Sequence, residues 1–147
     1  MIDLDNQILD ISELNTFASQ FCLKLKKGDI IFFKGELGVG KTTFARVIIR
    51  NLHTLNNLTI PKSIGSPTYP ILLIYNLTSY EIYHYDLYRI KNKDELAELD
   101  IFENIYNSIT LIEWPELLIE KKIKHKHYII NLEFQSETKR NINIKYL

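Results

Sequence analysis

The sequence predicts a three-layer α/β fold, in which helices cover both faces of a mixed, mostly parallel central sheet with an antiparallel hairpin portion. Short β-rich runs alternate with segments of helical apolar spacing along the 147 residues. A glycine-rich segment joins one such strand to a helix, and a later apolar run ends in an acidic residue, as a buried parallel strand can. We therefore expect one domain over residues 1–147, with a ligand at the carboxyl ends of the strands.

The first elements lead up to the glycine-rich segment. Residues 8–11 predict a short strand, and Ser12 is expected to N-cap a helix that Gly28 ends. The run IIFF at 30–33 predicts the next strand. Apolar residues at helical spacing then predict a helix as far as about His53.

The second part of the chain alternates between strands and short helices. Proline and glycine in residues 64–69 predict a loop, and residues 70–75 and 81–88 predict two strands joined by a turn, hence an antiparallel hairpin. The remaining expected elements are a short helix over 94–99, a buried strand over 110–114, a helix beginning at Pro115, and two final strands over 127–134 and 141–146.

Residues 35–42 read GELGVGKT, a complete GxxxxGK[ST] pattern between a predicted strand and a predicted helix. Glycines let the backbone wrap a phosphate closely, and the following helix N-terminus adds a favourable dipole. Lys41 is then expected to reach the β- and γ-phosphates, and Thr42 to place its hydroxyl on a magnesium ion. The pattern predicts a phosphate-binding loop.

Two acidic residues are candidates to complete such a site. Glu113 ends a predicted buried strand, where an acid can help to hold magnesium; the alternative is an exposed acid at a helix N-terminus before Pro115. Asp86 lies in the aromatic strand YHYDLY, where a charged side chain needs a partner or a metal. The alternative for Asp86 is a structural hydrogen bond to Arg89 or His84.

The segment SPTY at 66–69 is similar to mobile loops that sense a γ-phosphate through a threonine hydroxyl, here Thr68. An ordinary proline turn is an equally good interpretation. Arg89 is a candidate for stabilising charge on a phosphate, although a solvated or ion-paired arginine is the more frequent case.

Composition excludes several classes of protein. Eighteen basic and eighteen acidic residues give a formal charge of zero, so no direct strong binding to tRNA or other nucleic acid is predicted. No apolar window is long enough for a membrane span, and the first five residues lack the order of a signal peptide. The single cysteine, Cys22, suits a reducing compartment and a place in the core. We expect a cytoplasmic protein.

Four separated segments, GELGVGKTTF, SPTY, YHYDLYRI and LIEWPE, together resemble the bacterial TsaE family. The resemblance implies a three-layer P-loop NTPase domain that binds ATP and Mg²⁺ and hydrolyses ATP slowly or only with partners. It implies a role in forming N6-threonylcarbamoyladenosine beside the tRNA anticodon, with the proteins TsaD and TsaB as partners.

The resemblance also assigns roles by position. Thr42 and Glu113 match the magnesium ligands, and Asp86 and Lys41 match groups needed for hydrolysis. The remaining nucleotide contacts that it implies are Ser12, Thr16, Glu36, Leu37, Gly38, Val39, Gly40, Thr43, Thr68 and Arg140, besides Lys41 and Thr42 themselves. Gly65 departs from the family pattern, in which a polar residue is common before SPTY.

Three other functions compete with this one. Nucleotide could order residues 66–69 for docking to a partner, with incidental hydrolysis. A small P-loop kinase would carry the same loop, although the chain has only four arginines for phosphoryl transfer. A GTPase is suggested by NKDE at 92–95, which approaches the guanine-reading NKxD pattern but has Glu95 at its fourth position. We expect ATP.

Overall fold

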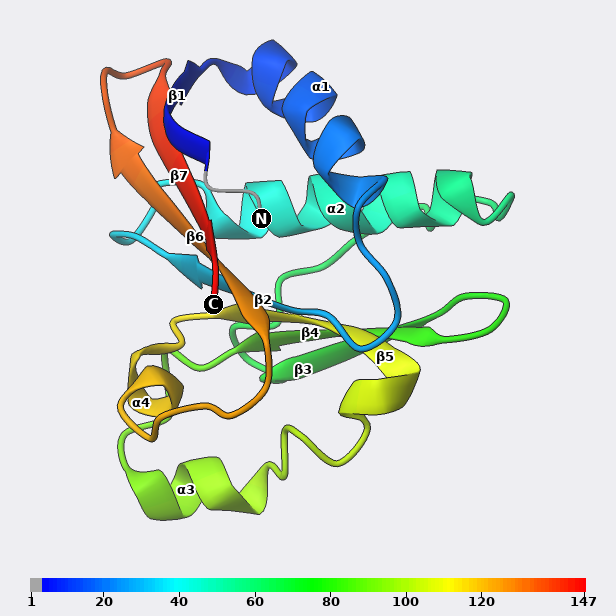
Figure 1. The fold of residues 1–147 in the computed structure, drawn as a ribbon, viewed down its shortest axis with the longest axis vertical. Helices are drawn as coiled ribbons and strands as arrows, with labels where there is room; N and C mark the ends of the chain where they lie inside the picture. Colours follow the sequence, from blue (N-terminus) through cyan, green and yellow to red (C-terminus); the bar gives the residue numbers. More distant parts are fainter. Residues whose placement is uncertain (1–3) are drawn as a thin grey trace.

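The computed structural model describes residues 4–147 and contains seven strands and four α-helices in that range (Figure 1). In chain order the elements are β1 (Leu4–Leu9), α1 (Ile11–Cys22), β2 (Ile30–Lys34), α2 (Lys41–Leu55), β3 (Leu72–Asn76), β4 (Glu81–Asp86), α3 (Lys93–Glu98), a 3-10 helix (Ile105–Asn107), β5 (Ser108–Glu113), α4 (Glu116–Ile119), β6 (His127–Phe134) and β7 (Arg140–Tyr146).

The strands form one mixed sheet in the order β1-β7-β6-β2-β5-β4-β3. The four central strands β6, β2, β5 and β4 run parallel, while β1 and β7 at one edge and β3 at the other are antiparallel to their neighbours. The predicted mixed sheet with an antiparallel hairpin, β3–β4, is confirmed. In the register of β4 with β5, Asp86 lies opposite Glu113, so both acids reach the same edge of the sheet.

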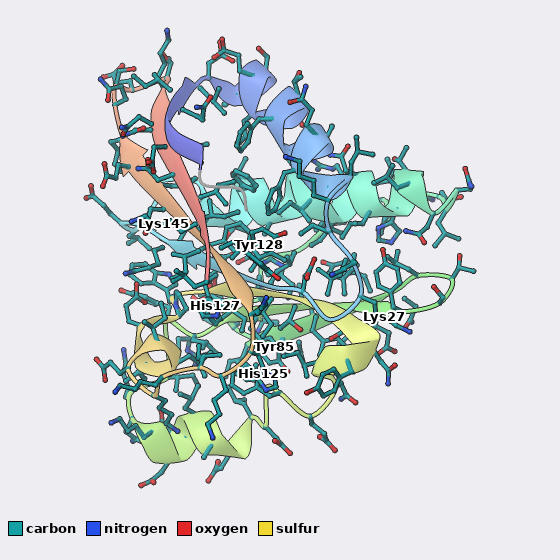
Figure 2. All side chains as sticks on the ribbon, viewed as in Figure 1. Lys27, Tyr85, His125, His127, Tyr128 and Lys145 are labelled. Carbon is teal, nitrogen blue, oxygen red and sulfur yellow. The ribbon has the colours of Figure 1, made fainter. Side chains whose placement is uncertain are left out.

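Helices cover both faces of the sheet and complete the three predicted layers. Helices α1 and α2 lie on one face, and the shorter α3 and α4 lie on the other (Figure 1). Tyr128 of β6 belongs to the core under α1 and α2, whereas Tyr85 of β4 belongs to the core beside α3 and α4 (Figure 2). Each face therefore has its own apolar cluster.

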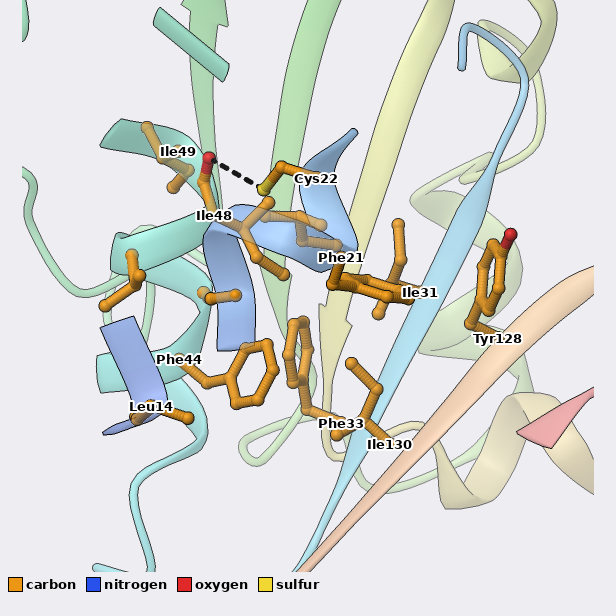
Figure 3. Close-up of a cluster of buried hydrophobic side chains, with 14 of the residues drawn as sticks. Leu14, Phe21, Cys22, Ile31, Phe33, Phe44, Ile48, Ile49, Tyr128 and Ile130 are labelled. Atoms are coloured by element: carbon orange, nitrogen blue, oxygen red, sulfur yellow. Dashed lines mark hydrogen bonds between the residues drawn. The ribbon is translucent and has the colours of Figure 1, made fainter. Parts of the chain in front are cut away.

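The larger cluster anchors α2, the helix that follows the glycine-rich loop (Figure 3). Phe33 of β2 and Phe44 of α2 are fully buried, with ring centroids 5.7 Å apart, and Phe21 of α1 meets Tyr128 edge-on at 5.1 Å. Burying a side chain such as Phe contributes about 1.5–3 kcal/mol. Because Phe33 lies just before the loop and Phe44 just after it, this packing fixes both ends of the loop.

Cys22 takes the predicted place in the same core. Its thiol is buried, with Sγ 3.8 Å from the carbonyl oxygen of Ile48 (Figure 3). Burial raises the pKa of the Cys22 thiol to about 12, because the charged thiolate loses its hydration. The thiol is thus a structural group.

The structure corrects the predicted start of α1. Ser12 is not the N-cap: Asp10 is, and its Oδ1 accepts a hydrogen bond from the Glu13 amide at 2.9 Å. Glu13 Oε2 in turn accepts from the Asp10 amide at 2.8 Å, which completes a capping box. The preceding strand accordingly occupies Leu4–Leu9 instead of 8–11, because Asp10 and Ile11 belong to the helix start.

Gly28 does not end α1 either, since the helix finishes at Cys22. Gly28 adopts a positive φ of 98° in the turn before β2, and its amide donates to the carbonyl of Ser108. Gly28 therefore allows the turn that leads the chain into β2.

Within residues 4–147, no helix is both long and apolar enough to cross a membrane. The expectation that the chain lacks a signal peptide rested on its first five residues, of which 1–3 lie outside the described range.

Candidate phosphate and metal site

The predicted phosphate-binding loop connects β2 to α2, and its glycines are required by its shape. At Gly35, with φ of 151°, an added Cβ would lie 2.6 Å from the Leu132 carbonyl oxygen and 2.7 Å from a Val39 methyl. Gly40 has a φ of 117° at the N-cap of α2 and provides no side-chain cap. The first amides of α2 therefore lack a side-chain cap, and they carry the positive end of the helix dipole.

Lys41, the first residue of α2, is nearly buried within this loop. Its Nζ donates to the carbonyls of Gly35 at 2.6 Å and Glu36 at 2.8 Å, and lies 4.0 Å from the ring centroid of Trp114. Burial lowers the Lys41 pKa, while nearby carboxylates, above all Glu113, oppose that shift. An anionic phosphate at this position would stabilise the charged amine.

Glu113 ends β5 and is buried, with 2% of its surface exposed, so the alternative of an exposed acid at a helix start is wrong. Its Oε2 accepts a hydrogen bond from the Thr42 hydroxyl at 2.8 Å. Its Oε1 lies 2.8 Å from Nε2 of His84, which is fully buried in β4. Both carboxylate oxygens are thus held in place by side chains of other elements.

The oxygen atoms of Thr42 and Glu113 would suit Mg²⁺ better than a transition metal. Among residues 4–147, no group of three or more His, Cys, Asp and Glu side chains is arranged to hold a metal. Mg²⁺ needs no such cage, because it is commonly held by one or two protein oxygens, with phosphates and water completing its octahedron. The paired oxygens of Thr42 and Glu113 fit this requirement.

Asp86 is also buried and bonded, but to neither predicted structural partner. Its Oδ2 accepts from the Thr68 hydroxyl at 2.9 Å, and its Oδ1 accepts from the Tyr88 amide at 2.9 Å. The Ser66 hydroxyl lies 2.8 Å from that of Thr68. The structure therefore links the SPTY segment directly to the acid at the end of β4.

Arg89 faces the same segment instead of an acid. Its Nη1 donates to the Tyr69 carbonyl at 3.2 Å, and its guanidinium carbon lies 5.4 Å from the centroid of the exposed Tyr69 ring. These contacts tie Arg89 to the SPTY segment.

Lys41, Thr42, Thr68, Asp86 and Glu113 line one small cavity, of about 200 Å³, at the carboxyl ends of β4 and β5. It unites residues from four separate parts of the sequence. Its lining consists of Leu37, Gly38, Gly40, Lys41, Thr42, Thr43, Thr68, Asp86, Glu113 and Trp114. Leu37 is the exposed apolar residue of this lining, whereas Lys41, Asp86 and Glu113, which could contact an anion and a divalent cation, are buried.

A larger cavity, of about 470 Å³, adjoins the other side of the loop. Gly38, Gly40 and Thr43 line both cavities, and much of the remaining wall is apolar, which suits an aromatic base. Its other lining residues are Leu9, Asp10, Ile11, Ser12, Leu14, Val39, Leu132, Glu137, Thr138, Arg140 and Ile142.

Of three residues that the resemblance assigns to nucleotide contacts, Ser12 and Arg140 line this larger cavity and Thr16 does not. Ser12 lines it, but its hydroxyl donates to Asp10 Oδ1 at 2.8 Å. Thr16 is exposed one turn further along α1, outside the lining of both cavities. Arg140 lines the cavity and braces the loop, since its Nε donates to the Val39 carbonyl at 2.8 Å.

Trp114 packs against the core beside α3 and α4, with its ring centroid 4.9 Å from that of Tyr88, and it also lines the small cavity described above. Trp114 adopts a left-handed conformation, with φ of 57°, which is uncommon for so large a residue. That turn places its ring against Lys41. The sequence signal for a place in the site is that Trp114 directly follows Glu113. The left-handed backbone conformation that turns its ring toward Lys41 could not be inferred from residue types.

The NKDE segment that suggested guanine has a structural explanation. Asn92 is the N-cap of α3, and its Oδ1 accepts from the Glu95 amide at 2.9 Å. Glu95 Oε2 accepts from the Lys91 amide at 2.8 Å. Both side chains are engaged in starting a helix.

The mixed, mostly parallel sheet with helices on both faces and a glycine-rich loop joining β2 to α2 define a three-layer α/β domain. The family model "Threonylcarbamoyl adenosine biosynthesis protein TsaE" matches residues 8–142. The chain belongs to this family.

Relatives named "tRNA threonylcarbamoyladenosine biosynthesis protein TsaE" include one from Rickettsia typhi, 37% identical over 139 residues, covering 90% of this chain and 88% of the relative. Another, from Rickettsia prowazekii, is 42% identical over 106 residues, covering 72% and 70%. The crystal structure of Bacillus subtilis YdiB aligns with a TM-score of 0.70 at 22% identity, covering 98% of this chain and 86% of that one. This last likeness supports the fold.

Proposed function

We propose that this protein is an ATP-binding, Mg²⁺-dependent ATPase that supports formation of N6-threonylcarbamoyladenosine next to the anticodon of tRNA. The observation that carries the proposal is the small cavity in which Lys41, Thr42, Asp86 and Glu113 converge below the loop. The adjoining larger cavity, with its apolar wall, offers space for the adenine base.

In this proposal each group of the small cavity has one task. The loop amides and Lys41 bind the phosphates, and Lys41 exchanges its carbonyl contacts for phosphate oxygens. Thr42 and Glu113 hold Mg²⁺, which when bound neutralises charge that develops on the phosphates. Glu113 is assigned to Mg²⁺ because it contacts Thr42, and Asp86 is the other carboxylate that lines the small cavity, so we assign Asp86 to orienting the attacking water.

The biological setting is proposed from the family. The curated relatives are named for threonylcarbamoyladenosine synthesis on tRNA, and TsaD and TsaB are the proposed partners in that assembly. Direct contact with tRNA is not required of this chain, whose formal charge is zero. A cytoplasmic location is part of the proposal, because the single cysteine suits a reducing compartment.

A docking switch is the second candidate, and the contact between Thr68 and Asp86 favours it. A phosphate that attracts the Thr68 hydroxyl would break this 2.9 Å bond and move the neighbouring Tyr69, which is 81% exposed. In that case hydrolysis is incidental. A non-hydrolysable ATP analogue that supports many rounds of tRNA modification would favour the switch over the ATPase.

The test is calorimetric titration of ATP with Mg²⁺ into wild-type protein and Lys41→Ala, followed by phosphate release with and without TsaD and TsaB. We expect the wild type to bind and Lys41→Ala to lose binding or turnover. Lys27→Ala is the control, because Lys27 is exposed at the opposite end of β2 (Figure 2). No binding by folded wild type, or unaltered binding and turnover by Lys41→Ala, would contradict the proposal. Transfer of the γ-phosphate to a metabolite, instead of its release as inorganic phosphate, would indicate a kinase.

A further inference from the structure

His84 is a fully buried histidine whose Nε2 contacts the carboxylate of Glu113. Its Nε2 lies 2.8 Å from Glu113 Oε1, while Glu113 Oε2 accepts from the Thr42 hydroxyl. Because a carboxylate oxygen accepts, Nε2 is the ring nitrogen that carries the hydrogen in this bond. A chain of contacts thus runs from the middle of β4 through the end of β5 to the first turn of α2.

The other ring nitrogen of His84 makes burial of this side chain energetically unfavourable. Nδ1 is buried, and within residues 4–147 it has no hydrogen-bond partner. Filling this space with leucine or isoleucine would leave no polar atom unpaired, and buried polar atoms without partners are disfavoured. What the imidazole adds over an apolar side chain is a donor aimed at Glu113.

The hydrogen bond from His84 limits rotation of the Glu113 side chain, and that rotation decides which way its carboxylate faces. Glu113 has three rotatable side-chain bonds, and the Thr42 contact alone would leave its carboxylate free to turn about Oε2. The contact with His84 holds Oε1 on the β4 side and leaves Oε2 facing α2. Partners of this kind, which orient a ligand without touching the metal, typically change metal affinity by about 10–100-fold.

We propose that His84 is a positioning residue that holds the Glu113 carboxylate with Oε2 directed at Thr42, ready to bind Mg²⁺ together with the nucleotide. The proposal rests on the proposed function, because it assumes that Glu113 and Thr42 are the protein ligands of Mg²⁺. A merely structural histidine would alter folding stability but not the dependence of nucleotide binding on Mg²⁺.

The experiment measures ATP affinity at increasing Mg²⁺ concentration and in excess EDTA for wild type, His84→Leu, His84→Gln and His84→Asn. Glutamine can place an amide donor near the position of Nε2, whereas asparagine is one carbon shorter. His53→Leu is the matched control, since His53 is a buried histidine far along α2, bonded to the Ile49 carbonyl. Circular dichroism and thermal unfolding report whether each variant folds.

We expect His84→Leu to require at least about tenfold more Mg²⁺ than wild type to reach the same ATP affinity. Its ATP affinity in excess EDTA should equal that of wild type. His84→Gln should recover most of the Mg²⁺ response, and His53→Leu should match wild type. If His84→Leu does not fold, the comparison of Gln with Asn decides, because only the longer amide reaches Glu113.

Two results overturn the proposal: a folded His84→Leu with a wild-type Mg²⁺ response, or Gln and Asn variants whose responses are equal. A wild-type protein that binds no ATP at all contradicts the proposed function instead, so the two failures are distinguishable.

Discussion

Thr42 and Glu113 are 71 residues apart in the sequence and are joined by a 2.8 Å hydrogen bond from hydroxyl to carboxylate. The bond links the first turn of α2 to the last residue of β5. It brings together the two oxygens that we propose as protein ligands of Mg²⁺, at the edge of the sheet where parallel strands deliver their carboxyl ends.

Replacing Thr42 by valine should remove the hydroxyl and keep the shape of the side chain. We expect the Mg²⁺-dependent part of ATP affinity to fall by about tenfold or more, as loss of a direct or orienting metal contact does. Titration calorimetry with and without Mg²⁺ measures it. Thr54→Val, on the exposed side of the same helix, is the control, and Thr42→Ser should behave like wild type. Equal Mg²⁺ dependence in Thr42→Val and wild type would rule out this role of the hydroxyl.

Gly35→Ala should destabilise the fold more than Gly28→Ala. Both glycines have positive φ, in regions that cost a residue with a Cβ about 1–3 kcal/mol. Only at Gly35 does the new Cβ also meet other atoms, at 2.6 and 2.7 Å, whereas nothing lies within 4 Å at Gly28. Urea unfolding of the two variants compares the free energies. Equal losses at the two positions would show that the loop can shift to accept a methyl group.

The Cys22 thiol should be unreactive in the folded protein and reactive once unfolded. Its pKa is about 12 in the fold against 9.0 for a free thiol, so at pH 8 the buried group offers almost no thiolate. A chromogenic disulfide reagent, with and without denaturant, checks this. Rapid labelling of native protein would contradict the burial.

The same shift predicts how Cys22 affects stability at high pH. Between pH 9 and about 12 the unfolded thiol loses its proton while the folded thiol keeps it, so the stability is present below pH 9 and is lost as pH rises through this window. Relative to Cys22→Ala, the wild-type free energy of unfolding should fall by about 1.4 kcal/mol per pH unit there. A difference between the two proteins that stays constant with pH would contradict this.

Much of the fold was predictable because its signals are local. The glycine-rich connection from β2 to α2, the hairpin of β3 with β4 and the buried β5 each follow from short runs of residue types, and the structure confirms these elements. The start of α1 was placed wrongly because Asp10 and Ser12 are both good N-caps, and the choice depends on the reciprocal bond with Glu13. The end of the same helix was placed wrongly because Gly28 belongs to the approach to β2.

The sequence by itself determined that a lysine and a threonine open the helix after a glycine-rich turn, and that Glu113 ends a buried strand. It placed Asp86 within a strand over 81–88, whereas the structure ends β4 at Asp86. Only the tertiary structure decided which groups touch. The pairing of β4 with β5 puts Asp86 opposite Glu113, and the packing of α2 on the sheet brings Thr42 to the carboxylate that His84 also contacts. Strand order and helix packing are set by contacts between distant segments, which no local pattern of residues specifies.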